Sequence, residues 1–200
     1  MLKSQTNPLS SEIIESQFID LFNQKGPYYT SYPTLGLWSD EYKTKSYQEG
    51  LKDLFRQEGS CVPIALYIHI PYCAKLCWYC ICNLKITNNR NKIQEFTDHL
   101  LREMEMLRIF FDQMSIAPNI KEIHLGGGTP SHLDNKQFSQ LIDGIAKLVS
   151  IDDLSEFAME IDPRTSSQED LEFYGEKGVT RISFGVQDFS PDVQKAINRV

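Results

Sequence analysis

Four short apolar runs along the chain predict β-strands. They lie at residues 64–70, 120–125, 157–161 and 180–186. The first run is apolar along almost its whole length, which predicts a strand buried on both faces. The second run ends in three consecutive glycines, Gly126 to Gly128. Together the runs predict the strands of one sheet.

Apolar residues at helical spacing predict helices between and beside these strands. The predicted helices cover residues 40–57, about 93–107, about 134–148, 167–177, and a last segment from residue 190 onward. Gln137 completes a box-like cap with Asp134, and Gly178 is a suitable residue just after a helix end. Ser190 is expected as the N-cap of the last helix, with Pro191 at its first helical position.

The N-terminal part has a different pattern. Residues 1–24 contain a short amphipathic segment with Ile14, Phe18, Leu21 and Phe22 at helical spacing. Residues 26–34 are aromatic, contain two prolines and show no period, which predicts an extended segment or loop. We expect residues 1–60 to form an N-terminal extension and residues 61–200 to form an α/β domain.

Strand–helix alternation repeats four times, which predicts a parallel α/β sheet with right-handed crossovers. Four such units cannot close into a barrel, and the fourth strand of an open sheet would leave an unpaired edge. We therefore expect the N-terminal part of a partial (β/α) barrel, truncated after about four βα units. The alternative is a complete open domain with four strands.

Composition narrows the possible classes of protein. The chain has 200 residues, of which 41% are hydrophobic and 24% charged, as in an ordinary globular protein. Its net charge of −7 argues against a nucleic-acid-binding surface. No apolar run approaches the roughly 20 residues that span a bilayer, and the first eleven residues lack the apolar core of a signal peptide. We expect a cytoplasmic protein that does not bind membranes.

All five cysteines lie between Cys61 and Cys82. Cys73, Cys77 and Cys80 form a C-x3-C-x2-C motif directly after the first predicted strand. Three thiolates on a short loop can bind three irons of a cubane iron–sulfur cluster and leave one iron open. A zinc site, with Cys82 as a possible fourth ligand, is the alternative, although zinc sites usually have a longer spacer between ligand pairs. Cys61 is expected to be an ordinary buried thiol.

Several segments, taken together in order, resemble one known family. They are residues 29–34, 67–83, 126–130, 160–164, 185–189 and 198–199. In these segments the chain is similar to the oxygen-independent coproporphyrinogen III oxidases of the radical S-adenosylmethionine (SAM) superfamily. The resemblance covers roughly residues 27–200, and it implies the partial barrel of that superfamily.

The resemblance also implies roles for individual residues. Cys73, Cys77 and Cys80 would hold a [4Fe-4S] cluster, and SAM would bind the open iron through its amino and carboxylate groups. Two SAM molecules bind in the family, and Gln187 and Arg199 match positions that contact the second. The full set of matching SAM positions is Tyr67, Tyr79, Gly127, Gly128, Thr129, Glu160, Gln187 and Arg199.

Each of these positions also has an ordinary structural explanation. A glycine run can make a tight turn, although that explains one glycine better than three. Glu160 is also consistent with a solvated residue at a strand end, Arg199 with an exposed helix cation, and the tyrosines with core residues. His69 and His124, at the ends of strands, are expected to be core or rim residues rather than catalysts.

The family reaction is the oxidative decarboxylation of coproporphyrinogen III to protoporphyrinogen IX in anaerobic haem biosynthesis. Its partners would be this substrate and an unidentified electron donor, and we expect a monomer. Similar haem chaperones have an aromatic residue where this chain has Cys82, so Cys82 favours the oxidase. Ile81 stands where the family typically has glycine, which alters packing beside the cluster. The alternatives are a haem chaperone and an inactive fragment of the oxidase.

Overall fold

The computed structural model describes residue 23 and residues 34–200. The chain divides into two compact units, Met1–Glu49 and Gly50–Val200, and each is considered by itself. The predicted amphipathic segment near residues 14–22 and the aromatic residues 26–33 lie outside the described residues. In the first unit, the described residues form a 3₁₀ helix, η1 (Leu35–Leu37), and the start of α2 (Thr44–Glu58).

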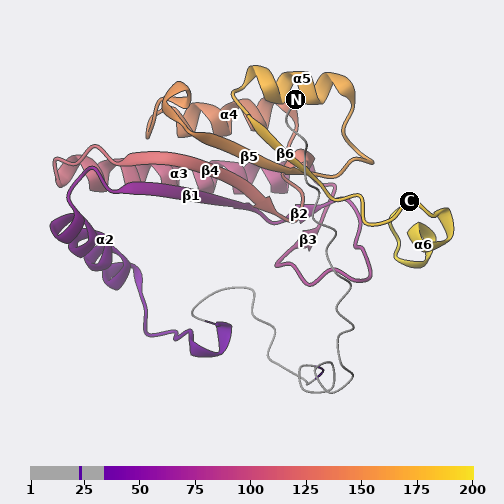
Figure 1. Ribbon diagram of the computed structural model, residues 1–200, viewed down its shortest axis with the longest axis horizontal. Coiled ribbons are helices and arrows are strands. Elements are labelled where there is room, and N and C mark those ends of the chain that lie inside the picture. The colour runs from indigo at the N-terminus through magenta and orange to yellow at the C-terminus, as the bar shows by residue number, and fades with distance from the viewer. Residues whose placement is uncertain (1–22, 24–33) are drawn as a thin grey trace, which may run out of the picture. The chain divides into compact units, whose positions relative to one another are not determined.

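Four parallel strands form the main sheet of the second unit. They are β1 (Pro63–Ile70), β4 (Asn119–Gly127), β5 (Glu156–Ile161) and β6 (Arg181–Phe184), and they lie side by side in chain order (Figure 1). The predicted parallel α/β sheet is therefore confirmed. Because all four strands run the same way, their carboxyl ends meet at one edge.

Three helices connect these strands and pack on one face of the sheet. They are α3 (Arg90–Gln113), α4 (Asn135–Ile145) and α5 (Gln168–Glu176) (Figure 1). The core contains buried apolar side chains from these helices and from the strands, such as Ile93, Leu125, Phe138 and Phe157. Within the described residues, we find no helix that is both long and apolar enough to cross a bilayer.

The prediction that the first strand is buried on both faces is wrong. Ile68 and Ile70 are buried against the helices, whereas Tyr67, which directly precedes them, is 56% exposed. The side chains of a strand alternate between the two faces, and α3, α4 and α5 cover only one of them (Figure 1). The opposite face of the sheet therefore carries the remaining side chains of β1.

Helix ends follow the local sequence closely. Asp134 and Gln137 form the predicted capping box of α4, and Ser167 forms a similar one with Asp170 at the start of α5. Gly178 follows α5 with φ +93°, a conformation that favours glycine.

Two predictions near the carboxyl end needed correction. The fourth strand covers only Arg181–Phe184, since the Val186 amide donates to the Phe184 carbonyl and turns the chain away. Ser190 does precede α6 (Pro191–Ala196), but its side chain makes no capping bond. Instead the Ser190 amide donates to Asp188 Oδ1 at 2.7 Å.

Several short elements were not predicted. Strands β2 (Tyr72–Cys73) and β3 (Lys85–Ile86) form a second, parallel pair. The 3₁₀ helices η2 (Pro130–His132) and η3 (Ile151–Asp153) precede α4 and β5. Cys61 was predicted to be buried but is exposed, because it lies in the turn before β1, where the sheet has not yet begun.

Candidate cluster and SAM site

The cysteine loop starts where β1 ends. Pro71 is followed by β2, and the Thr87 amide donates to the Cys73 carbonyl at 3.1 Å, which ties the end of the loop to its beginning. The Cys80 amide donates to the Cys77 carbonyl at 3.0 Å and forms a tight turn between these two cysteines. The loop is therefore held at the carboxyl edge of the sheet.

Helix α6 holds the other side of this loop. The Trp78 amide donates to the Ile197 carbonyl at 3.1 Å, and Asn198 Nδ2 donates to the Leu76 carbonyl at 2.7 Å. Figure 1 shows α6 beyond the carboxyl ends of the strands, next to this region. Two segments more than a hundred residues apart in the chain thus form one wall.

A pocket of about 560 Å³ lies between the cysteine loop and the strand ends. Four of the five cysteines line it: Cys73, Cys77, Cys80 and Cys82. Soft thiolates select iron–sulfur clusters, zinc or copper(I), and a cubane cluster takes each thiolate on a different iron. Thiols distributed around one pocket fit such a cluster. Among the residues that the structure describes, no three His, Cys, Asp or Glu side chains form a site for a single metal ion.

The glycine run at the end of β4 brings the sheet close to the cysteines. A Cβ on Gly128 would lie 3.0 Å from Cys73 Sγ and 3.0 Å from the Tyr72 carbonyl oxygen. Gly127 has φ +119°, and a Cβ there would lie 2.9 Å from the Ile70 carbonyl oxygen. Close packing therefore accounts for more than one of these glycines.

Thr129 and Glu160 add polar groups to this wall. Thr129 Oγ1 lies 3.1 Å from Cys73 Sγ. Glu160 Oε2 accepts a hydrogen bond from the Gly127 amide at 3.3 Å, and its side chain is 47% exposed. The carboxylate is thus oriented by the backbone while one side stays open to the pocket.

Tyr67 lies on the sheet face opposite the helices, beside the pocket. Its ring stacks on His124, with centroids 5.7 Å apart, and His124 Nε2 lies 3.4 Å from Glu160 Oε1. The Tyr67 hydroxyl lies 3.1 Å from His69 Nδ1. Burial, followed by the nearby charge of Glu160, raises the pKa of Tyr67, so this hydroxyl is a hydrogen-bonding group at neutral pH.

Arg199 is not the exposed helix cation that its sequence position allowed. Its side chain is only 10% exposed. Nε donates to the Gly185 carbonyl at 2.9 Å, and Nη1 donates to Cys77 Sγ at 3.2 Å. The guanidinium group therefore lies directly beside a predicted cluster ligand.

The remaining predicted SAM positions are also at this pocket. Gln187 lines the pocket, and its backbone has φ +69°. This left-handed conformation is uncommon for residues other than glycine and recurs at functional sites. Tyr79 lines the pocket too, and burial raises its pKa although Arg199 opposes the shift. Of the predicted SAM-contacting set, all but Tyr67 line the pocket.

Burial also affects the thiols. It raises the pKa of Cys73, with the Thr129 hydrogen bond opposing the shift, and it raises the pKa of Cys82. Metal ligation requires the thiolate form, so a cluster held by Cys73 would displace the proton of this thiol.

Sequence reasoning assigned no role to Asp162 and Arg164, which also line the pocket. Asp162 is 8% exposed and forms an ion pair with Arg164 at 2.6 Å. Their position just after the third predicted strand could have indicated a role in binding, because ligands bind at this edge of parallel α/β sheets.

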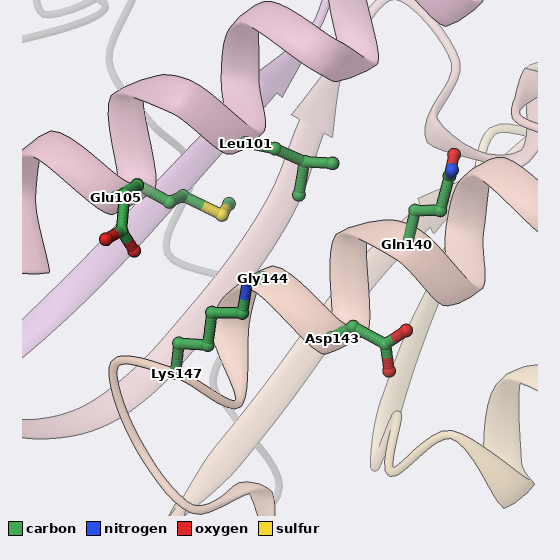
Figure 2. A pocket seen from close by; sticks show the side chains of 7 residues that line it. Leu101, Glu105, Gln140, Asp143, Gly144 and Lys147 are labelled. Carbon is green, nitrogen blue, oxygen red and sulfur yellow. The ribbon is translucent and has the colours of Figure 1, made fainter.

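A second cavity, of about 220 Å³, lies between α3 and α4. Figure 2 shows Leu101 and Glu105 on α3 opposite Gln140, Asp143 and Gly144 on α4. Its lining contains no cysteine, unlike that of the first pocket.

Comparison with known proteins places the chain in a family. The family model of the radical SAM superfamily matches residues 67–200. The chain therefore belongs to the radical SAM superfamily, whose members use a [4Fe-4S] cluster and SAM.

Within that superfamily, the chain is similar to proteins named oxygen-independent coproporphyrinogen III oxidase. The one from Pseudomonas aeruginosa is 34% identical over 188 residues, which cover 93% of this chain and 40% of the relative. The one from Escherichia coli is 32% identical over 181 residues, covering 90% and 38%.

A solved structure gives the same result. Coproporphyrinogen III oxidase from Escherichia coli, described as a radical SAM enzyme, matches with a TM-score of 0.73 and 32% identity, over 86% of this chain and 38% of that one. The predicted resemblance is thus confirmed. The chain spans about two fifths of the length of these curated relatives.

Proposed function

We propose that Cys73, Cys77 and Cys80 hold a [4Fe-4S] cluster and that SAM binds beside it. The observation that carries this proposal is the pocket of about 560 Å³ that all three thiols line, in a member of the radical SAM superfamily. Three protein thiolates leave one iron without a protein ligand, which is the position that SAM would occupy.

The chain's own residues would bind and orient SAM. The Glu160 carboxylate, fixed by the Gly127 amide, suits the amino group of SAM as an acceptor of its N–H bonds. The glycine backbone at Gly127 and Gly128 lets a ligand approach closely, and Thr129 borders the same wall. Tyr79 lines the pocket beside the thiols, and Tyr67 closes the neighbouring sheet face.

We propose a second SAM position at Gln187 and Arg199. Both residues line the pocket, on the side formed by the end of β6 and by the segment after α6. Arg199 already donates to the Gly185 carbonyl and to Cys77 Sγ, and its fixed positive charge would attract the carboxylate of SAM.

When bound, the cluster supplies one electron to SAM, which then provides the radical that removes a hydrogen atom from the substrate. Around it, the residues of this chain would orient the reactants. Glu160 would hold the amino group of SAM and Arg199 would attract a SAM carboxylate, while the proposed ligands Cys73 and Cys77 are themselves buried.

The whole protein would convert coproporphyrinogen III to protoporphyrinogen IX. Each of two propionates would lose one hydrogen atom to the SAM-derived radical, CO₂, and one electron to a one-electron acceptor, and a vinyl group would remain. The relatives' name supports this substrate. We propose a monomer in the cytoplasm that receives electrons from a separate donor.

Anaerobic turnover tests this function. Cluster-loaded protein, given SAM, a reductant and coproporphyrinogen III, should release CO₂ and form protoporphyrinogen IX. A protein in which Cys73, Cys77 and Cys80 are replaced by alanine is the control and should form none. Tight haem binding without any turnover of coproporphyrinogen would contradict the proposal and favour a haem chaperone.

A further inference from the structure

A buried carboxylate lies directly behind the cysteine loop. Asp162 follows the last residue of β5 and is 8% exposed. It accepts hydrogen bonds from Arg164 Nε at 2.9 Å and from Arg164 Nη2 at 2.6 Å, one on each carboxylate oxygen. Two parallel N–H···O bonds fix the plane of a guanidinium group as well as its position. The backbone amide of Arg164 also donates to Asp162 at 3.1 Å, which holds the turn itself.

Both arginines near this carboxylate reach the same sulfur. Arg199 Nη2 lies 3.5 Å from Asp162 Oδ1, and its Nη1 donates to Cys77 Sγ at 3.2 Å. Arg164 Nη2 approaches the same sulfur at 3.9 Å. The buried Asp162 carboxylate thus interacts with two guanidinium groups, and both of these groups contact the Cys77 sulfur.

The charge balance at this sulfur is positive. The two guanidinium groups and the one carboxylate give the surroundings of the Cys77 sulfur a net charge of +1. The hydrogen bonds from Arg164 keep the pKa of Asp162 below its ordinary value, despite the opposing effect of burial, so the carboxylate stays ionised at neutral pH. Arg164 is therefore held in place as a permanent cation.

Hydrogen bonds to cluster sulfurs and nearby charge set the reduction potential of an iron–sulfur cluster. Reduction adds one negative charge to the cluster. A cation beside a ligand sulfur stabilises that reduced form more than the oxidised form, so it raises the midpoint potential. This reasoning rests on the proposed function, because it requires Cys77 to be a cluster ligand.

We propose that Arg164, braced by Asp162, is a positioning residue that raises the reduction potential of the cluster through Cys77. It makes the cluster easier to reduce. Within the described residues, the Arg164 side chain bonds to Asp162, to Cys77 Sγ and to the Val200 carbonyl, so its effect on the cluster passes through the sulfur and Asp162.

The test is a redox titration of the loaded protein, followed by EPR of the reduced cluster. Arg164→Gln keeps most of the side-chain length but removes the charge, and we expect a midpoint potential more negative than that of the wild type. Arg164→Lys keeps the charge but cannot bond both Asp162 oxygens and the sulfur at once, so it should shift the potential the same way by less.

Arg181→Gln is the matched control. Arg181 forms a more exposed ion pair with Glu156 at 2.8 Å, at the amino ends of β5 and β6, away from the cysteines. Its loss should leave the potential unchanged. If Arg164→Gln takes up no cluster, the test rests on Arg164→Lys. A midpoint potential below that of the wild type in Arg164→Lys supports the proposed role of Arg164.

Two results would contradict the proposed role of Arg164, and only one of them also contradicts the proposed function. A loaded Arg164→Gln or Arg164→Lys protein with the wild-type potential contradicts the role of Arg164 alone. A wild-type protein that assembles no cluster under the same conditions contradicts the proposed function, and the role of Arg164 with it.

Discussion

Gly128 shows how a single residue allows the cysteine loop to pack closely against the end of β4. A Cβ at this position would lie 3.0 Å from Cys73 Sγ and equally close to the Tyr72 carbonyl oxygen. One of these neighbours is backbone, so a methyl group must displace either the strand end or the cysteine loop. The position of Cys73 relative to the other thiols therefore depends on a glycine here.

We expect Gly128→Ala to take up several-fold less iron and sulfide during anaerobic reconstitution. The added methyl group shifts Cys73 away from the position that the cluster requires. Iron and sulfide per protein are measured after removal of unbound metal. Gly175→Ala is the control, because a Cβ at Gly175 meets no atom within 4 Å. Equal loading of Gly128→Ala and the wild type would contradict this role.

At this scale, the sequence predicts the proposed ligands better than their surroundings. The spacing of Cys73, Cys77 and Cys80 predicts three neighbouring thiols, because a short loop cannot separate its own thiols widely, and all three line one pocket. Asp162 and Arg164 were not predicted, since their role depends on Cys77, which lies more than eighty residues earlier in the chain. Contacts of this kind come from the sheet register, which local patterns do not contain.

Among the elements, α5 illustrates how a helix end is fixed. Gly178 follows the helix with φ +93°, and a Cβ there would lie 2.3 Å from Ile151 Cγ2. A side chain at this position therefore meets both a strained backbone and a close neighbour. Gly175, within the same helix, has neither constraint.

We expect Gly178→Ala to lower the free energy of unfolding by about 1–2 kcal/mol, from left-handed backbone strain and the contact with Ile151. Gly175→Ala should raise it by up to about 1 kcal/mol, because alanine is the better helix former. Urea unfolding of the cluster-free proteins, followed by circular dichroism, measures both. Equal stability of the two variants would contradict this account of the helix end.

The long elements were predictable because their signals are local. Apolar runs identified the four strands, and the Asp134–Gln137 box identified the start of α4. Strands β2 and β3 were missed because each has two residues, too few for any period. The burial of β1 was overestimated because its composition does not reveal that the helices pack on one face only.

In the second unit as a whole, the strand order brings distant segments to one edge of the sheet. Strands β1, β4, β5 and β6 lie in chain order and in parallel, so the cysteine loop, the glycine run, Glu160 and the end of β6 meet at their carboxyl ends. The alternation of strands and helices predicted this edge. Which residues approach the sulfurs there was determined by packing and by the return of the chain after α6.

The most direct test of the central claim is EPR of the dithionite-reduced protein after anaerobic reconstitution with iron and sulfide, with and without SAM. We expect a [4Fe-4S] signal that changes when SAM is added, because in the proposed site SAM occupies the iron that has no protein ligand. The signal should be absent when Cys73, Cys77 and Cys80 are replaced by alanine. A protein that forms no cluster, or a cluster signal that SAM leaves unchanged, would contradict the claim.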